Sequence, residues 1–158
     1  MFPAVSTVDG EYTPIAYTNL NSYDDASTVS GNRYYYKIRA YVNVNGTDYL
    51  GEYSQPLSAQ SKIQLYGFCE DGKMSLTWTA WPSAVKYQIY CAPKGSDEFV
   101  LLKNKAGLAY ETTQYKDSLK NRVDFEPSIT YQFKVCAVLA DGTKSPESNI
   151  IETTYFID

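Results

Sequence analysis

The sequence predicts an all-β chain that folds as an antiparallel β-sandwich, and three observations lead to this prediction. Aromatic residues make up 15% of the 158 residues, including 16 tyrosines, and aromatic side chains favour the half-buried surface of a pleated sheet. Apolar and polar residues alternate in several short runs, which is typical of strands with one buried face. Turn signals separate these runs at regular intervals, as they do in sandwiches.

A tyrosine-led stretch occurs twice and predicts a tandem repeat. Residues 34–40 (YYYKIRA) match residues 131–137 (YQFKVCA), and a hairpin pair follows each, Asn45-Gly46 and Asp141-Gly142. Such pairs supply the positive φ angles of tight hairpins. Two upstream landmarks match in the same order, residues 12–15 with 99–102 and 23–25 with 115–117. Period-2 alternation predicts that the following side chains face inward: Tyr34, Tyr36, Ile38, Ala40, Tyr131, Phe133, Val135 and Ala137.

The other elements follow from the same alternation. Trp78 and Cys91 are expected to face inward from their strands. The segment from Tyr115 to Val123 is read as a loop with at most one turn of helix, because Leu119 and Val123 share one helical face. The remaining strands are predicted at residues 54–58, 63–69, 74–78, 87–91 and 149–156.

With these elements placed, the second copy, Lys62 to Asp158, resembles a fibronectin type III domain over its full length. The resemblance implies an immunoglobulin-like antiparallel β-sandwich in which Trp78 lies on the second strand. It also implies that Tyr131 forms a tyrosine corner and that Leu119 is the apolar plug before that corner. The Gly-x-Tyr-Ser run at 51–54 ahead of a proline is similar to bacterial surface and polysaccharide-processing proteins, which carry such modules in arrays.

The first copy is expected to be partial. Only 11 residues precede Tyr12, whereas 37 separate Lys62 from the matching Phe99, and three strands do not fit into 11 residues. We therefore predict a partial fibronectin type III-like domain over residues 1–58, lacking its first three strands, and a complete one over residues 59–158. Residues 1–8 supply at most one improvised strand, and the short linker before Ile63 favours a stiff pair of domains.

An open edge and an uncovered inner face follow from the missing strands. Tyr34, Tyr36 and Ile38 would lie on that face. We expect that the chain is cut from a longer one, or that another copy covers the face, which makes a homodimer through residues 1–58 a hypothesis.

Composition argues against several functions. The chain contains no histidine, the commonest general base and metal ligand, and no convergent carboxylates or calcium loop, so we predict no enzyme, no metal and no cofactor. The net charge is −4 without a basic cluster, which argues against nucleic-acid binding. No apolar run is long enough for membrane insertion, and residues 1–5 do not read as a signal peptide.

Neither the adjacent Asp24 and Asp25 nor the cysteines predict a reactive site. The aspartates are read as a turn, since neighbours on a strand point to opposite faces. Cys91 is expected inward and Cys136 outward as a free thiol, so that the two do not bridge, while Cys69 has no predicted role. All three are predicted to be reduced.

Tyrosines are the predicted binding surface, namely Tyr35, Tyr41, Tyr49 and Tyr53. An exposed tyrosine offers a rigid apolar ring with a polar tip. The favoured function is a non-catalytic, extracellular or cell-surface spacer or adhesion module of a multidomain protein, whose partners are other domains of the parent chain and a protein ligand. The alternative is a carbohydrate-binding accessory of a polysaccharide-processing enzyme. A flat cluster of tyrosines would favour the alternative, and scattered tyrosines the first reading.

Overall fold

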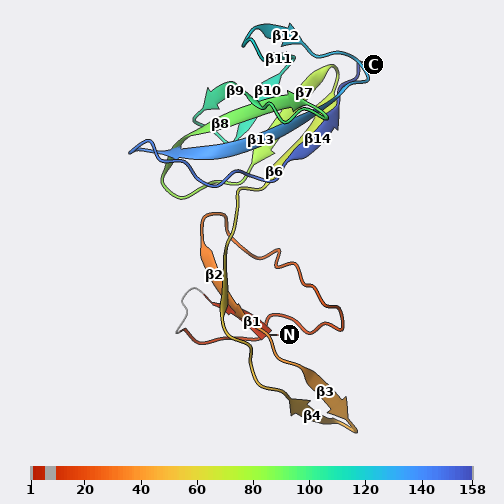
Figure 1. The fold of residues 1–158 in the computed structure, drawn as a ribbon, viewed down its shortest axis with the longest axis vertical. Coiled ribbons are helices and arrows are strands. Elements are labelled where there is room, and N and C mark those ends of the chain that lie inside the picture. Colours follow the sequence, from red (N-terminus) through yellow and green to blue (C-terminus); the bar gives the residue numbers. More distant parts are fainter. Residues whose placement is uncertain (1, 6–9, 158) are drawn as a thin grey trace. The chain divides into compact units, whose positions relative to one another are not determined.

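The computed structural model describes residues 2–5 and 10–157, which divide into two compact units, Met1–Ser61 and Lys62–Asp158. Every regular element among the described residues is a β-strand, and all strand pairs are antiparallel (Figure 1). The all-β prediction is therefore confirmed. Over the same residues, no helix is present that is long and apolar enough to cross a membrane.

The second unit is a sandwich of two sheets. One sheet has the strand order β10-β7-β6 and the other the order β14-β13-β8-β9, with β8 and β13 paired along most of their length (Figure 1). A short hairpin, β11–β12, lies outside both sheets. The strands are β6 (Leu65–Glu70), β7 (Lys73–Trp78), β8 (Ala84–Pro93), β9 (Val100–Lys105), β10 (Ala109–Thr112), β11 (Gln114–Lys116), β12 (Arg122–Asp124), β13 (Thr130–Leu139) and β14 (Ile151–Thr154).

A single apolar core fills the space between the two sheets. Trp78 and Tyr131 both belong to it, as do Phe133 and Val135, whose side chains are fully buried. The alternation predicted for this copy is thus confirmed. Each large side chain that is fully buried contributes about 1.5–3 kcal/mol relative to an exposed one, so the core, rather than any single contact, stabilises this unit.

The tyrosine corner of the second unit forms as the resemblance implied. Tyr131 Oη accepts a hydrogen bond from the backbone N–H of Glu126 at 3.1 Å. The predicted plug is wrong, because Leu119 is 79% exposed at the tip of the β11–β12 hairpin. Phe125 is buried in its place, with its ring centroid 4.7 Å from that of Tyr131. Leu119 was misassigned because residues 115–123 form a β-hairpin instead of the expected loop.

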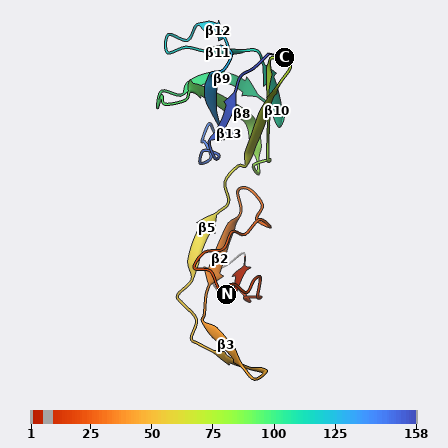
Figure 2. The same ribbon diagram turned by 90° about the vertical axis from the view of Figure 1, so that its right-hand side faces the viewer.

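The first unit holds a three-stranded sheet and a separate two-stranded ribbon (Figure 2). In the sheet, β2 lies between β1 and β5, and in the ribbon β3 pairs with β4. The bounds are β1 (Phe2–Val5), β2 (Arg33–Lys37), β3 (Tyr41–Val44), β4 (Thr47–Leu50) and β5 (Leu57–Gln60). The last strand begins three residues later than predicted, because Ser54 bonds to Ile38 outside the ladder through both its backbone and its hydroxyl.

Hydrogen bonds of the two units repeat position by position. Tyr34 Oη accepts the N–H of Val29, five residues upstream, at 2.8 Å, as Tyr131 does with Glu126. Ser54 Oγ accepts the N–H of Ile38 at 3.1 Å, and Ser148 Oγ accepts that of Val135 at 3.0 Å. These matching bonds confirm that the two tyrosine-led stretches are structural repeats. The repeat extends to the equivalent turns at Gly31 and Ser128, which share a positive φ and donate to Ser61 and Tyr155.

Strand β1 takes the place of the second half of β8. Ala4 pairs with Tyr36 as Cys91 pairs with Phe133, the equivalent residue of the second unit. The prediction that residues 1–8 supply at most one improvised strand is confirmed, because β1 is the one strand described there. Phe2 of β1 pairs with Lys37, the last residue of β2. In the second unit, β13 stays paired with β8 as far as Leu139. The predicted single strand 34–40 is wrong, because β2 ends at Lys37 and the next strand, β3, begins at Tyr41.

The first unit has no buried apolar side chain among residues 10–61. Ser30 is the one residue of this range in the buried class, and all buried hydrophobic residues of the described chain lie from Ile63 onward. Tyr34 and Tyr36 are half-buried, and Ile38 is 53% exposed. The inner face of the first sheet is therefore open to solvent in the described part of the chain.

Candidate interaction surface

The β3–β4 hairpin is built by a two-residue turn. Asn45 and Gly46 both have positive φ, 52° and 84°, which matches the right-handed twist of the flanking strands. Asn43 fixes the turn twice, because its side-chain amide donates to Asp48 Oδ1 at 2.7 Å and its Oδ1 accepts the N–H of Gly46 at 3.1 Å. All eight strand residues of this ribbon are exposed.

Apolar side chains project from both faces of the ribbon. Tyr41 pairs with Leu50, and Val42 pairs with Tyr49. Directly opposed residues share a face, while sequence neighbours alternate, so Tyr41 and Leu50 lie on one face and Val42 and Tyr49 on the other. Their exposed fractions lie between 42% and 59%. Tyr41 and Tyr49 thus do not form one flat platform.

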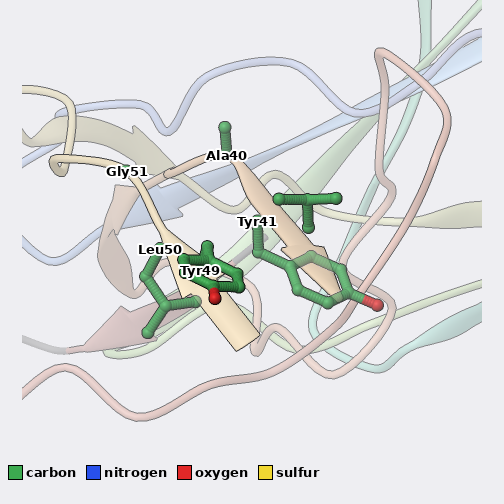
Figure 3. A pocket seen from close by; sticks show the side chains of 6 residues that line it. Ala40, Tyr41, Tyr49, Leu50 and Gly51 are labelled. Carbon is green, nitrogen blue, oxygen red and sulfur yellow. The ribbon is translucent and has the colours of Figure 1, made fainter. Parts of the chain in front are cut away.

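A shallow hollow of about 320 Å³ lies at the base of the hairpin (Figure 3). The two strands are joined there by a hydrogen bond from the N–H of Gly51 to the carbonyl of Ala40 at 2.9 Å. The hollow is lined by Ala40, Tyr41, Val42, Tyr49, Leu50 and Gly51. Its walls are mostly apolar, which suits an apolar ligand group.

A second hollow, of about 490 Å³, is more polar and lies beside Tyr41. The Tyr17 ring contacts the Tyr41 ring edge to face, with centroids 5.3 Å apart. The walls of this hollow come from Tyr17, Thr18, Asn19, Arg39, Ala40 and Tyr41. Two tyrosine rings beside hydroxyl, amide and guanidinium groups offer both stacking surface and hydrogen-bonding groups.

The predicted residues Tyr53 and Tyr35 lie elsewhere. The Arg39 guanidinium stands over the Tyr53 ring at 4.5 Å, and both residues line a third hollow of about 510 Å³. Tyr35 is half-buried on β2, where it pairs with Ser58, and it lines none of the three hollows. Of the four predicted tyrosines, the structure brings Tyr41 and Tyr49 to one hairpin and leaves the other two apart.

An exposed aromatic pair in the second unit escaped the sequence analysis. Tyr66 and Phe68 are 59% and 55% exposed on β6, and both face away from the core. They lie opposite Thr77 and Ser75 of β7. The signal was present in the sequence, because Leu65 faces inward, so the even-numbered residues of this strand must face outward.

None of the cysteines is an exposed thiol. All three are free and buried. Cys136 is free and points away from the main core, as predicted, but it is only 3% exposed beside Tyr90 and Lys144. Burial raises the pKa of the Cys91 and Cys136 thiols, which lowers their reactivity at neutral pH. Cys69 is also buried and contacts the carbonyl oxygen of Phe156 at 3.5 Å.

The predicted turn at Asp25 has a structural basis. Its Oδ1 accepts hydrogen bonds from the hydroxyl and the backbone N–H of Ser27, and its Oδ2 accepts one from the Tyr36 hydroxyl at 3.1 Å. The Ser27 hydroxyl lowers the pKa of this carboxyl. Burial, followed by the bond to Asp25, raises the pKa of Tyr36 to about 12. Over the described residues, no group of three His, Cys, Asp or Glu side chains is placed to hold a metal ion.

The strand order and the tyrosine corner define the class of the second unit, which has a fibronectin type III-like fold. In this class a three-stranded and a four-stranded sheet enclose one core, and architectures of this kind occur in many cell-surface domains.

No protein-family model matches the chain, and no curated protein matches it. Similar solved structures include an Fn3-like protein from Clostridium thermocellum, with 19% identity and a TM-score of 0.45 over 58% of this chain and 86% of that one. Domains A168-A170 from titin are 12% identical, with a TM-score of 0.45, over 80% of this chain and 41% of the titin segment. The chicken CNTN1 FN1-FN3 domains are 14% identical, with a TM-score of 0.44, over 97% of this chain and 52% of theirs.

Proposed function

We propose that this chain is a non-catalytic spacer and adhesion module of a multidomain surface or secreted protein, and that it binds a partner protein through the β3–β4 hairpin. The observation that carries the proposal is the exposure of apolar side chains on both faces of this ribbon. Contiguous exposed apolar surface is typical of interaction sites.

The chemistry of the hairpin supports a protein partner. Asp48 is its one charged residue, and it is hydrogen-bonded to Asn43. The centres of protein interfaces are poor in charge and rich in tyrosine. A ribbon with apolar side chains on both faces fits a groove or a cleft between domains better than it fits a flat ligand.

The test is binding of the full chain to a panel of immobilised matrix and cell-surface proteins. Replacing Val42 and Tyr49 with serine removes one apolar face, and we expect a loss of at least about tenfold in affinity, as for a central interface residue. Tyr66→Ser in the second unit is the matched control, because it also removes an exposed aromatic ring. Equal affinities of the hairpin variant and the control would contradict the proposal.

A second candidate function is carbohydrate binding, favoured by the hollow between Tyr17 and Tyr41. Aromatic rings beside amide and hydroxyl groups suit a sugar ring, which has an apolar face and a polar rim. A glycan array distinguishes the two functions. If the hollow binds sugar, Tyr17→Ala and Tyr41→Ala each abolish the signal, while the Val42 and Tyr49 changes on the opposite face leave it intact.

A further inference from the structure

The turn of the β3–β4 hairpin joins an asparagine directly to a glycine. Asn45 and Gly46 are both exposed, and a Cβ built on Gly46 would meet nothing within 4 Å. No residue that the structure describes hydrogen-bonds to the Asn45 carboxamide. The backbone nitrogen of the glycine and the carboxamide of the asparagine are therefore neighbours along the chain, with open space beside the glycine.

An asparagine followed by a glycine is able to modify itself in water. After it loses its proton, the backbone nitrogen of Gly46 attacks Asn45 Cγ, the new N–C bond closes a succinimide ring, and the side-chain nitrogen leaves as ammonia. Water then adds to a carbonyl of the ring and breaks one of its C–N bonds, which gives aspartate or isoaspartate. Glycine favours the attack, because it has no Cβ to hinder the approach and its backbone rotates freely.

Asn45 is the one asparagine of the chain that precedes a glycine. Each of the others is followed by a residue whose side chain hinders the same attack. These others are Asn19, Asn21, Asn32, Asn43, Asn104, Asn121 and Asn149. The reaction should therefore be confined to this turn, and the other asparagines serve as internal controls.

The hairpin restrains the reaction through Asn43. Its Oδ1 accepts the N–H of Gly46 at 3.1 Å, and this is the N–H that must lose its proton before the attack. Its amide also donates to Asp48 Oδ1 at 2.7 Å, which ties the acceptor to the opposite strand. The positive φ angles of Asn45 and Gly46 belong to the closed hairpin turn. The attack thus requires the tip of the ribbon to open locally, and the bonds of Asn43 oppose that opening.

We propose that Asn45 is a site of spontaneous deamidation, that the Asn43 side chain sets its rate, and that its products alter the β3–β4 ribbon. Either product adds a negative charge to a ribbon whose one charged residue is Asp48. Isoaspartate also routes the backbone through its Cβ, and the longer turn disturbs the register of Tyr41 with Leu50. An effect on partner binding rests on the function proposed above, whereas the modification itself does not.

The test follows the full chain by mass spectrometry during warm incubation at neutral and mildly alkaline pH. Trypsin releases residues 40–62 as one peptide, because Arg39 and Lys62 flank its cleavage sites, and fragmentation distinguishes Asn45 from Asn43. We expect a carboxyl to replace the amide at Asn45 alone, and enzymatic methylation to detect isoaspartate there. The rate should rise with pH, because the attacking nitrogen must be deprotonated. An unmodified Asn45, conversion spread evenly over the other asparagines, or a rate independent of pH would overturn the proposal.

The second arm measures the restraint by Asn43. Asn43→Ala removes both side-chain hydrogen bonds, and we expect about tenfold faster conversion at Asn45. Val44→Ala is the matched control, because Val44 is exposed on the same strand and takes part in neither bond, so it should keep the original rate. The chain unfolded in urea gives the rate of an unrestrained turn, which should exceed that of the native chain. Equal rates in the two variants, or in the native and unfolded chains, would show that Asn43 does not restrain the turn.

Discussion

The substitution Tyr131→Phe isolates the hydroxyl of the tyrosine corner. The Tyr131 side chain is 1% exposed, and phenylalanine preserves the ring contacts with Phe125. What is lost is the acceptor for the Glu126 N–H at 3.1 Å. A buried donor left without its partner costs about 1–3 kcal/mol. For a domain of about 100 residues, each kcal/mol lowers Tm by about 4–8 °C.

Tryptophan fluorescence during urea unfolding measures this change in the second unit alone. The chain has two tryptophans, Trp78 and Trp81, and both lie in that unit. Tyr66→Phe is the control, because its ring is 59% exposed and loss of a surface hydroxyl changes stability by less than about 0.5 kcal/mol. An unfolding midpoint for Tyr131→Phe equal to that of the control would refute the role assigned to the corner.

Three further results are expected. Gly67→Ala should destabilise the second unit by about 1–3 kcal/mol, because the new Cβ would lie 2.5 Å from Ile151 Cδ1, 2.7 Å from Leu76 Cδ2 and 3.2 Å from the Ser75 carbonyl oxygen; an unchanged urea midpoint would show that these neighbours move aside at no cost. The three buried cysteines should react slowly with a thiol reagent in the native chain and fully in denaturant; rapid native labelling would contradict their burial. Tyr36 should ionise near pH 12 by ultraviolet absorbance. Its contribution to stability is full below pH 10 and declines between pH 10 and 12, because the unfolded chain ionises first. Asp25→Asn should move the titration towards pH 10, and an unaltered titration would exclude the hydrogen bond.

The sequence was sufficient to predict those strands whose alternating side chains are buried in the core. Alternation along residues 131–137 identified an inner strand because every second side chain of β13 meets the core. The repeat likewise matched Tyr34 with Tyr131, and in the structure the Tyr34 hydroxyl accepts the equivalent hydrogen bond, from the N–H of Val29. In both cases the prediction uses only residues of the strand itself, and it does not depend on which other segments pack against that strand.

Features that depend on contacts between distant segments could not be predicted from the sequence pattern. Phe125, not Leu119, fills the core before the corner, because the residues between them pair with each other as a hairpin. Cys136 has the outward position that alternation predicts, yet Tyr90 and Lys144 cover it from other segments. The position of β1 depends on its pairing with β2, about thirty residues away, which local periodicity does not reveal.

Only part of the candidate surface could be predicted, because the register between two strands is not visible in the sequence pattern. Exposed tyrosines on the β3–β4 hairpin follow from the turn signal at 45–46 and from the composition. The opposite orientation of Tyr41 and Tyr49 follows from register, because Tyr41 pairs with Leu50 and Val42 with Tyr49. That register separates the tyrosines and favours a protein groove over a flat sugar as the ligand of the ribbon.

The shared framework of the two units is tested most directly by cross-strand nuclear Overhauser contacts. The structure places Tyr34 opposite Ala59 and Tyr131 opposite Thr153, in equivalent registers. It also places Ala4 beside Tyr36, where the second unit has Cys91 beside Phe133. Observation of all four pairings is the predicted result. Random-coil shifts throughout residues 33–60, or any helical pattern of contacts there, would contradict it.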